Sequence, residues 1–141
     1  MKEFTIRPRM GEKQFLLIEK IVNGSFSALF KSFMTKYAGL SIEEDCFFDS
    51  ENKAWIVAAF DEFKSMHNLT KEFKDKGWGL KVPFAYDQGG WHYCLSFDAN
   101  TYGKIIVNRW TDHSSEDQFL TIADSFESFM NGLKKRPENL N

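Results

Sequence analysis

The chain has 141 residues, which is the size of one domain and enough to bury a substantial core. Its 15 Phe, four Trp and four Tyr remove large apolar areas from water, so the core needs no metal or disulfide to hold it. The formal net charge of −2 is nearly neutral and gives no indication of binding to nucleic acid or to an anionic membrane. We expect a single domain over residues 1–141, with its core from about residue 12 to 134 and no cofactor.

Two cysteines, Cys46 and Cys94, are too few for a disulfide framework. Residues 1–10 have no apolar run of signal-peptide length, and no segment approaches the length of a membrane span. The sequence therefore predicts a reduced, cytoplasmic protein with no membrane partner. Residues 1–10 are expected to form an arm or a short edge segment, and the tail to Asn141 is expected to be mobile.

Two amphipathic helices are predicted in the first forty residues. Residues 12–22 carry apolar side chains at helical spacing, and Asn23-Gly24 supplies a stop. The next helix can be capped by Ser25 or Ser27, and Gly39 ends it in a left-handed conformation. Its apolar positions are three and four apart and predict a core-facing stripe of Phe26, Leu29, Phe30, Phe33, Met34 and Tyr37.

Two strands and a third helix are predicted next. Residues 42–48 and 54–60 are extended segments around the polar turn 49–52, and the nearly continuous apolar run of the second favours an interior strand. Residues 63–77 are predicted to be a helix that ends at Gly77. Its apolar face consists of Phe63, Met66, Thr70 and Phe73.

The centre of the chain is organised around a glycine-containing turn. A short apolar run, residues 82–86, leads into Asp87-Gln88-Gly89-Gly90. Paired glycines permit positive φ or a close approach of the backbone, so Gly89 and Gly90 indicate a tight turn between strands.

Two extended segments follow the turn, residues 91–97 and 104–110, and are joined across residues 98–103. The first segment alternates, which is typical of a half-buried antiparallel strand. One face is predicted to hold Trp91, Tyr93, Leu95 and Phe97, and the other His92, Cys94, Ser96 and Asp98.

A polar loop, residues 111–118, precedes a terminal helix from about Asp124 to Leu133. Asp124 and Glu127 have the spacing of a capping box. Strands joined by short turns imply a largely antiparallel sheet, against which amphipathic helices bury their stripes. The predicted fold class is therefore α+β, a single domain with a mainly antiparallel sheet packed against helices.

Charge is unevenly distributed along the chain. Residues 64–81 contain five Lys against Glu72 and Asp75. Residues 84–128 are acidic, with only Lys104 and Arg109 against Asp87, Asp98, Asp112, Glu116, Asp117, Asp124 and Glu127. An acidic surface of this kind can steer a basic partner, although solvated charged faces are common in proteins without such a role.

Reactive chemistry has two candidate positions, and each has a simpler interpretation. His92 and Cys94 leave the same face of a strand and could form half a zinc site or a Cys–His pair, but a zinc site needs four ligands and a nucleophile needs a positioned base. Asp112-His113 could form an acid–base cluster, but its polar surroundings offer no desolvation to shift a pKa. Phosphate-loop motifs are absent. We expect no catalytic residues and no metal.

Four segments together resemble the SUKH superfamily, in the order found there. An early helix ends in an aromatic residue and Gly, a strand–glycine turn–strand unit follows, then a strand ending in an aromatic, and last a helix similar to the SFxxFLxxL pattern. The resemblance extends from about Phe26 to Leu133, through residues 29–39, 84–98, 103–110 and 123–133.

The resemblance implies an α+β domain without a catalytic centre. Bacterial SUKH proteins are typically immunity proteins that neutralise a cognate toxin, often a nuclease, whereas fungal relatives are the larger Smi/Knr regulators of cell-wall glucan synthesis. The first hypothesis is thus an immunity protein with a basic nuclease toxin as partner and no direct nucleic acid contact. The alternatives are a regulatory module that binds a peptide or intracellular protein, and an enzyme using Cys94 and His92 or a metal. The partner-binding residues predicted for the first hypothesis are Asp87, Gln88, Trp91, Asp98, Tyr102, Asp112, Glu116 and Asp117.

Overall fold

The fold was analysed in a computed structural model, which describes residues 7–138. Most of the N-terminal arm predicted for residues 1–10 and the end of the tail predicted to be mobile lie outside the described residues. Within them the chain forms four α-helices and seven strands in an α+β arrangement, which confirms the predicted fold class.

The predicted helices all form, and local sequence explains their ends. Helix α1 ends where Asn23 takes the left-handed conformation with φ 52°. Ser27 caps α2, because its Oγ accepts the N–H of Phe30 at 3.1 Å, and Gly39 beyond the helix has φ +81° as predicted. The four helices are α1 (Glu12–Val22), α2 (Ala28–Tyr37), α3 (Phe63–Asp75) and α4 (Phe126–Gly132).

The strands form two antiparallel sheets. A two-stranded sheet pairs β1 (Cys46–Phe48) with β2 (Ala54–Ile56). The larger sheet has the order β3-β4-β5-β6-β7, so that each strand pairs with its neighbour in the chain. Its strands are β3 (Ala59–Phe60), β4 (Lys81–Tyr86), β5 (His92–Ser96), β6 (Ile105–Asn108) and β7 (Phe119–Ala123).

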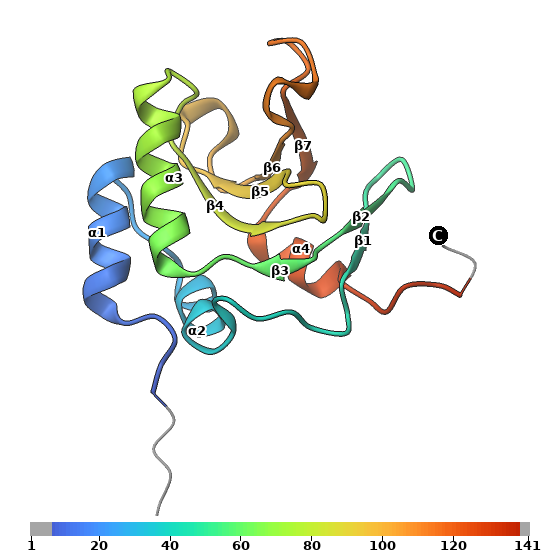
Figure 1. The fold of residues 1–141 in the computed structure, drawn as a ribbon, viewed down its shortest axis with the longest axis horizontal. Coiled ribbons are helices and arrows are strands. Elements are labelled where there is room, and N and C mark those ends of the chain that lie inside the picture. The colour runs from blue at the N-terminus through green and yellow to red at the C-terminus, as the bar shows by residue number, and fades with distance from the viewer. Residues whose placement is uncertain (1–6, 139–141) are drawn as a thin grey trace, which may run out of the picture.

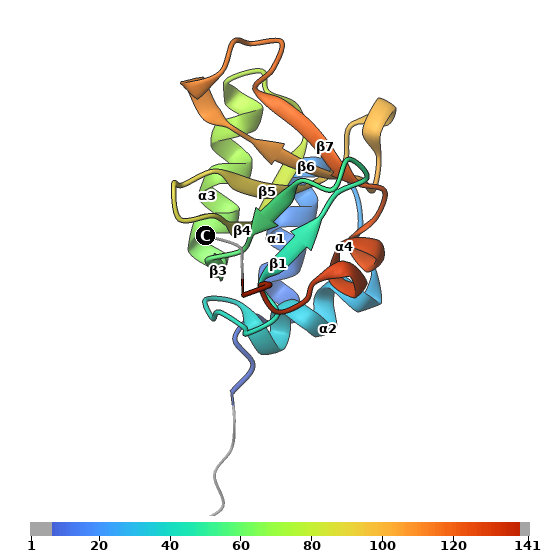
Figure 2. The same ribbon diagram turned by 90° about the vertical axis from the view of Figure 1, so that its right-hand side faces the viewer.

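Helices cover both faces of the larger sheet (Figures 1 and 2). Helices α1 and α3 run side by side, and α3 packs along β4. Helices α2 and α4 lie together across the other face, where the ring of Phe30 is 4.9 Å from that of Phe126. The ring of Phe84 in β4 packs edge-on against Phe126 and Phe129 of α4, at 5.3 and 5.8 Å. The main core is therefore aromatic and lies between the sheet and α2 and α4.

The double coverage corrects the prediction of a half-buried strand. Tyr93 and Leu95 face the main core as the alternation predicts, but Cys94 and Ser96 on the other face are also buried, at 0% and 1% exposure. Strand β5 is the central strand, and α3 with the aromatic side chains around Phe73 covers its second face. Alternation between apolar and small polar residues did not reveal this second layer.

The prediction of one interior strand over residues 54–60 is also wrong. The segment divides into β2, in the small sheet, and β3, at the edge of the large one. The chain crosses between the sheets at Val57 and Ala58, whose N–H groups donate to Asp45 and Tyr86 carbonyls at 2.8 Å. The apolar run is buried because it lies between layers, which periodicity cannot distinguish from an interior strand.

Two further differences concern the C-terminal part of the chain. Strand β7 occupies residues between the predicted loop and helix, and no element was predicted there. The capping box of α4 uses Ser125 and Ser128 in place of Asp124 and Glu127, with the Oγ of Ser125 accepting the Ser128 N–H at 3.0 Å. The helix thus begins one residue later than the acidic pair suggested.

Replacing Phe84 with Ala should lower the free energy of unfolding by about 3–5 kcal/mol, because it leaves a cavity among fully buried rings. Leu16→Ala is the matched control, since Leu16 is 47% exposed on α1 and its truncation should cost about 0.5 kcal/mol or less. Urea unfolding followed by circular dichroism measures both. A loss below about 1 kcal/mol for Phe84→Ala would contradict the role given to this ring.

Candidate protein-interaction site

The turn between β4 and β5 is organised by the carboxylate of Asp87. Its Oδ1 accepts the backbone N–H groups of Gly89 and Trp91, each at 2.9 Å. The backbone N–H of Asp87 also donates to the Trp91 carbonyl at 2.9 Å, and that of Gly90 donates to the Asp87 carbonyl at 3.1 Å. Gly90 has φ +91°, a conformation that a side chain would strain. The predicted tight turn is confirmed, and Asp87 fixes it.

The loop between β6 and β7 folds against this turn through two tryptophans. The Nε1–H of Trp91 donates to Oδ2 of Asp112 at 2.7 Å, and the Nε1–H of Trp110 donates to the Gly90 carbonyl at 2.8 Å. The ring of His113 packs edge-on against Trp91, with centroids 5.5 Å apart. Asp112 and His113, considered above as an acid–base cluster, are thus exposed residues in contact with an indole.

Arg109 is a member of this site that the sequence interpretation did not include. Its guanidinium group lies 5.9 Å from the centroid of the Trp91 ring and donates to the backbone carbonyl of Asp117. Its backbone N–H donates to the Gln118 carbonyl at 2.8 Å. Arg109 therefore fixes the end of the loop against Trp91, and the only earlier indication was its position as one of two bases in an acidic segment.

Six of the predicted partner-binding residues come together here and define what we call the acidic end of the sheet. The side chains of Gln88, Asp112, Glu116 and Asp117 are exposed, whereas Asp87 and Trp91 are half-buried. The turn also borders a groove of about 300 Å³, to which the β1–β2 hairpin contributes Lys53, Trp55 and neighbouring residues. The acidic end is the set Asp87, Gln88, Trp91, Asp112, Glu116 and Asp117.

The other two predicted residues, Asp98 and Tyr102, lie at the opposite end of β5. A strand of five residues is about 17 Å long, so one partner surface would have to extend around the molecule to include both sets. Asp98 has internal partners, because its Oδ2 lies 2.6 Å from Nζ of Lys81 and its Oδ1 accepts the Leu80 N–H at 2.8 Å. Tyr102 is 60% exposed.

On the face that carries His92 and Cys94, Cys94 is fully buried, whereas His92 is half-buried against the ring of Trp110. Nδ1 of His92 lies 3.2 Å from Oδ2 of Asp61, a residue that no sequence pattern connects with His92. The Cys94 thiol lies 3.9 Å from the backbone carbonyl of His92, and no hydrogen bond between this thiol and the imidazole is found in residues 7–138. Burial, aided by the charge of Asp61, raises the pKa of Cys94 far above its usual value. The thiol is therefore held in its neutral, poorly nucleophilic form.

Metal and membrane features were also considered for the described part of the chain. Across residues 7–138, no three His, Cys, Asp or Glu side chains are grouped so that they could bind a metal ion. None of the helices there has both the length and the apolar character that crossing a bilayer requires.

Comparison with protein families gives one match, which covers most of the chain. Residues 12–130 match the family model SUKH_6, described as SMI1-KNR4 cell-wall. The chain belongs to the SUKH family. The resemblance found in four separate segments is thereby confirmed, and the fold described above is that of a SUKH domain. No curated protein matches the sequence.

Asp87→Ala should lower the free energy of unfolding by about 1–2 kcal/mol, because two backbone N–H groups of the turn lose a charged acceptor. Gln88→Ala is the control within the same turn and should change stability by about 0.5 kcal/mol or less, since Gln88 is exposed. Chemical denaturation measures both variants. Equal stabilities would show that Asp87 does not determine the turn.

Both cysteine thiols should be unreactive in the native protein. Burial raises the pKa of Cys46 as it does that of Cys94, and both side chains are inaccessible at 0% exposure. At pH 8, Ellman's reagent should therefore modify neither thiol in native buffer and both in guanidinium chloride. Rapid modification of Cys94 in the folded protein would revive the nucleophile hypothesis.

Proposed function

We propose that this SUKH protein is a non-enzymatic immunity protein that binds a cognate toxin through its acidic end and neutralises it. The observation that carries the proposal is the joining of the β4–β5 turn to the β6–β7 loop by the Trp91–Asp112 hydrogen bond. This bond sets the exposed carboxylate of Asp112 against a half-buried tryptophan, and the same loop carries the exposed Glu116 and Asp117. A tryptophan surrounded by polar groups is typical of a protein-binding surface.

A nuclease is the toxin class that this charge fits best. Enzymes that hold nucleic acid present Lys and Arg to phosphates, so an acidic surface can cover such a site and compete with the substrate. Complementary charge also increases the rate of association. Asp112, Glu116 and Asp117 have the exposure that long-range steering needs, and all three belong to the loop that Asp112 joins to Trp91.

The proposal gives the protein no catalytic activity. The hydrogen-bond partners of Cys94 and His92 support this. A catalytic thiol needs a base within hydrogen-bond range, whereas the Cys94 Sγ is directed at a backbone carbonyl. His92, which is half-buried, is paired instead with the buried Asp61. These two residues serve packing in the proposed function.

A regulatory or scaffold module of the Smi/Knr type is the second candidate. The groove between the turn and the β1–β2 hairpin favours it, because about 300 Å³ lined by Trp55, Lys53 and Asp87 suits a peptide of mixed charge. The gene next to that of this protein separates the two candidates. A toxin encoded there, and captured by the purified protein, supports immunity, whereas a neighbouring toxin that does not bind contradicts it.

Reversing charge at the loop should slow association with the toxin encoded by the adjacent gene. The variant Asp112→Lys, Glu116→Lys and Asp117→Lys should associate about tenfold or more slowly at low salt, with a weaker dependence on ionic strength. Stopped-flow or surface-based kinetics at several salt concentrations measure both quantities.

The matched control carries Lys at Glu12, Glu43 and Glu44, which are exposed acids on α1 and before β1. It changes the net charge equally but leaves the acidic end intact, so its association should remain close to wild type. Equal slowing in both variants would show that net charge, and not the acidic end, steers the partner.

A further inference from the structure

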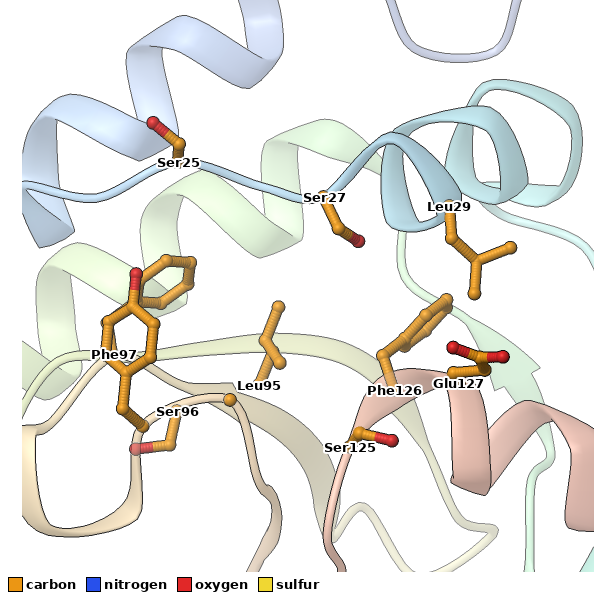
Figure 3. A pocket seen from close by; sticks show the side chains of 11 residues that line it. Ser25, Ser27, Leu29, Leu95, Ser96, Phe97, Ser125, Phe126 and Glu127 are labelled. Carbon is orange, nitrogen blue, oxygen red and sulfur yellow. The ribbon is translucent and has the colours of Figure 1, made fainter.

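A cavity at the opposite end of the sheet has a different chemical character. It has a volume of about 290 Å³ and lies where β5 ends and where α2 and α4 begin. Leu29 of α2 and Phe126 of α4 face each other at one end of it, with Leu95 beside Phe126 and Phe97 farther along (Figure 3). Neither the family match nor the proposed function assigns a role to this cavity.

Two large side chains at the cavity, one aliphatic and one aromatic, expose much of their apolar surface to solvent. Leu29 belongs to the apolar stripe predicted to face the core, yet it is 45% exposed. Tyr102 is 60% exposed and packs edge-on against Phe97 at 5.6 Å. The floor beneath them is buried and apolar, with Leu95 and Phe97 at 8% and 7% exposure. Part of the apolar surface of α2 and of the β5–β6 connection is therefore not covered by the chain's own core.

Three of the four serines that line the cavity use their hydroxyls within the protein. Oγ of Ser27 caps α2 by accepting the Phe30 N–H at 3.1 Å. Oγ of Ser96 lies 2.7 Å from that of Thr101, and Oγ of Ser125 accepts the Ser128 N–H at 3.0 Å. These three groups have partners, and Ser25, the fourth serine, is exposed, so its hydroxyl is accessible to water. The buried part of the lining therefore does not require a polar ligand, and the cavity favours an apolar occupant.

One carboxylate gives the cavity a charge. Glu127 lines it and is exposed, and no ion pair to Glu127 is found among residues 7–138. No base lines the cavity with it. An occupant that carries positive charge beside its apolar part is therefore favoured over an acidic one.

The size of the cavity decides between a small-molecule ligand and a side chain. Sites for drug-sized ligands and cofactors occupy about 300–1,000 Å³ and enclose most of the ligand, so this one lies at the lower limit. A single large side chain needs less space, and deep burial of one such side chain is the usual form of an interface anchor.

We propose that this cavity is an anchor pocket for a protein partner and takes a large apolar side chain whose sequence neighbour is Lys or Arg. Leu29, Leu95, Phe97, Tyr102 and Phe126 contact the apolar side chain, and Glu127 pairs with the neighbouring base. The inference rests on the proposed function to the extent that a basic toxin is the natural source of such a segment.

The test uses two dipeptide probes with the full-length protein. N-acetyl-Trp-Lys-amide should shift backbone amide resonances around Leu95, Gly103 and Glu127 in two-dimensional NMR titrations, whereas N-acetyl-Trp-Glu-amide should bind more weakly. Tyr102→Ala should weaken binding of the Lys probe about threefold to tenfold. Glu127→Gln should weaken it about twofold to fivefold and remove the preference for Lys over Glu.

Leu16→Ala is the control, because Leu16 is an exposed leucine of α1 outside the cavity, and it should bind the Lys probe as the wild type does. Tyr102 and Glu127 are exposed, so their variants should fold, which the same spectra verify. Equal binding of the two probes, or shifts confined to other parts of the protein, would overturn the proposal.

Binding of the whole toxin separates this inference from the proposed function. Toxin affinity that falls on loop charge reversal but not in Tyr102→Ala overturns the anchor pocket and retains immunity. Affinity that falls in Tyr102→Ala and Glu127→Gln, with the Leu16→Ala control unchanged, supports the pocket. Selective binding of the Lys probe without any toxin binding supports the pocket chemistry and contradicts immunity.

Discussion

The packing of aromatic rings around Phe84 is the constraint on which the rest of the structure depends. The pairing of β4 with β5 shifts register at Phe84, and such an irregularity bends a strand and increases its twist. The ring lies against Phe30 of α2 and against Phe126 and Phe129 of α4. Two helices that are far apart in sequence are thereby fixed on one face of the sheet. The cavity lies where these two helices begin, and the turn of the acidic end follows the strand that carries Phe84.

Helices could be predicted from the sequence because their apolar stripes depend on local spacing. The limits of α1 and α2 follow from Asn23 and Ser27, which act within their own turn. Strand β7 and the division of residues 54–60 could not be predicted in the same way, because they depend on which layer lies opposite. The burial of Cys94 and Ser96 on the second face of β5 has the same origin, because residues distant in sequence pack there. His92 lies against Trp110, which in turn packs against Phe73 of α3.

The candidate site was predictable in part. The turn and the acidity of the following loop are visible in the sequence, and the structure joins them. Asp87 and Asp98 flank the same predicted strand, so the sequence already implied that they lie at opposite ends. The hydrogen-bond partners within the site could not be predicted from the sequence. The bond from Trp91 to Asp112 and the bond from Arg109 to the Asp117 carbonyl depend on how two loops pack together at one end of the sheet.

The two ends of the sheet suit different parts of a binding process. Exposed carboxylates act at long range and mainly accelerate encounter, whereas a buried apolar anchor acts only at contact and slows dissociation. At the acidic end, Asp87 and Asp112 are already held by hydrogen bonds, so little conformational freedom remains to be lost on binding. At the cavity, Leu29 and Tyr102 expose apolar surface that a partner would remove from water. A partner that used both ends would have to span β5, which requires a macromolecule and excludes a small ligand.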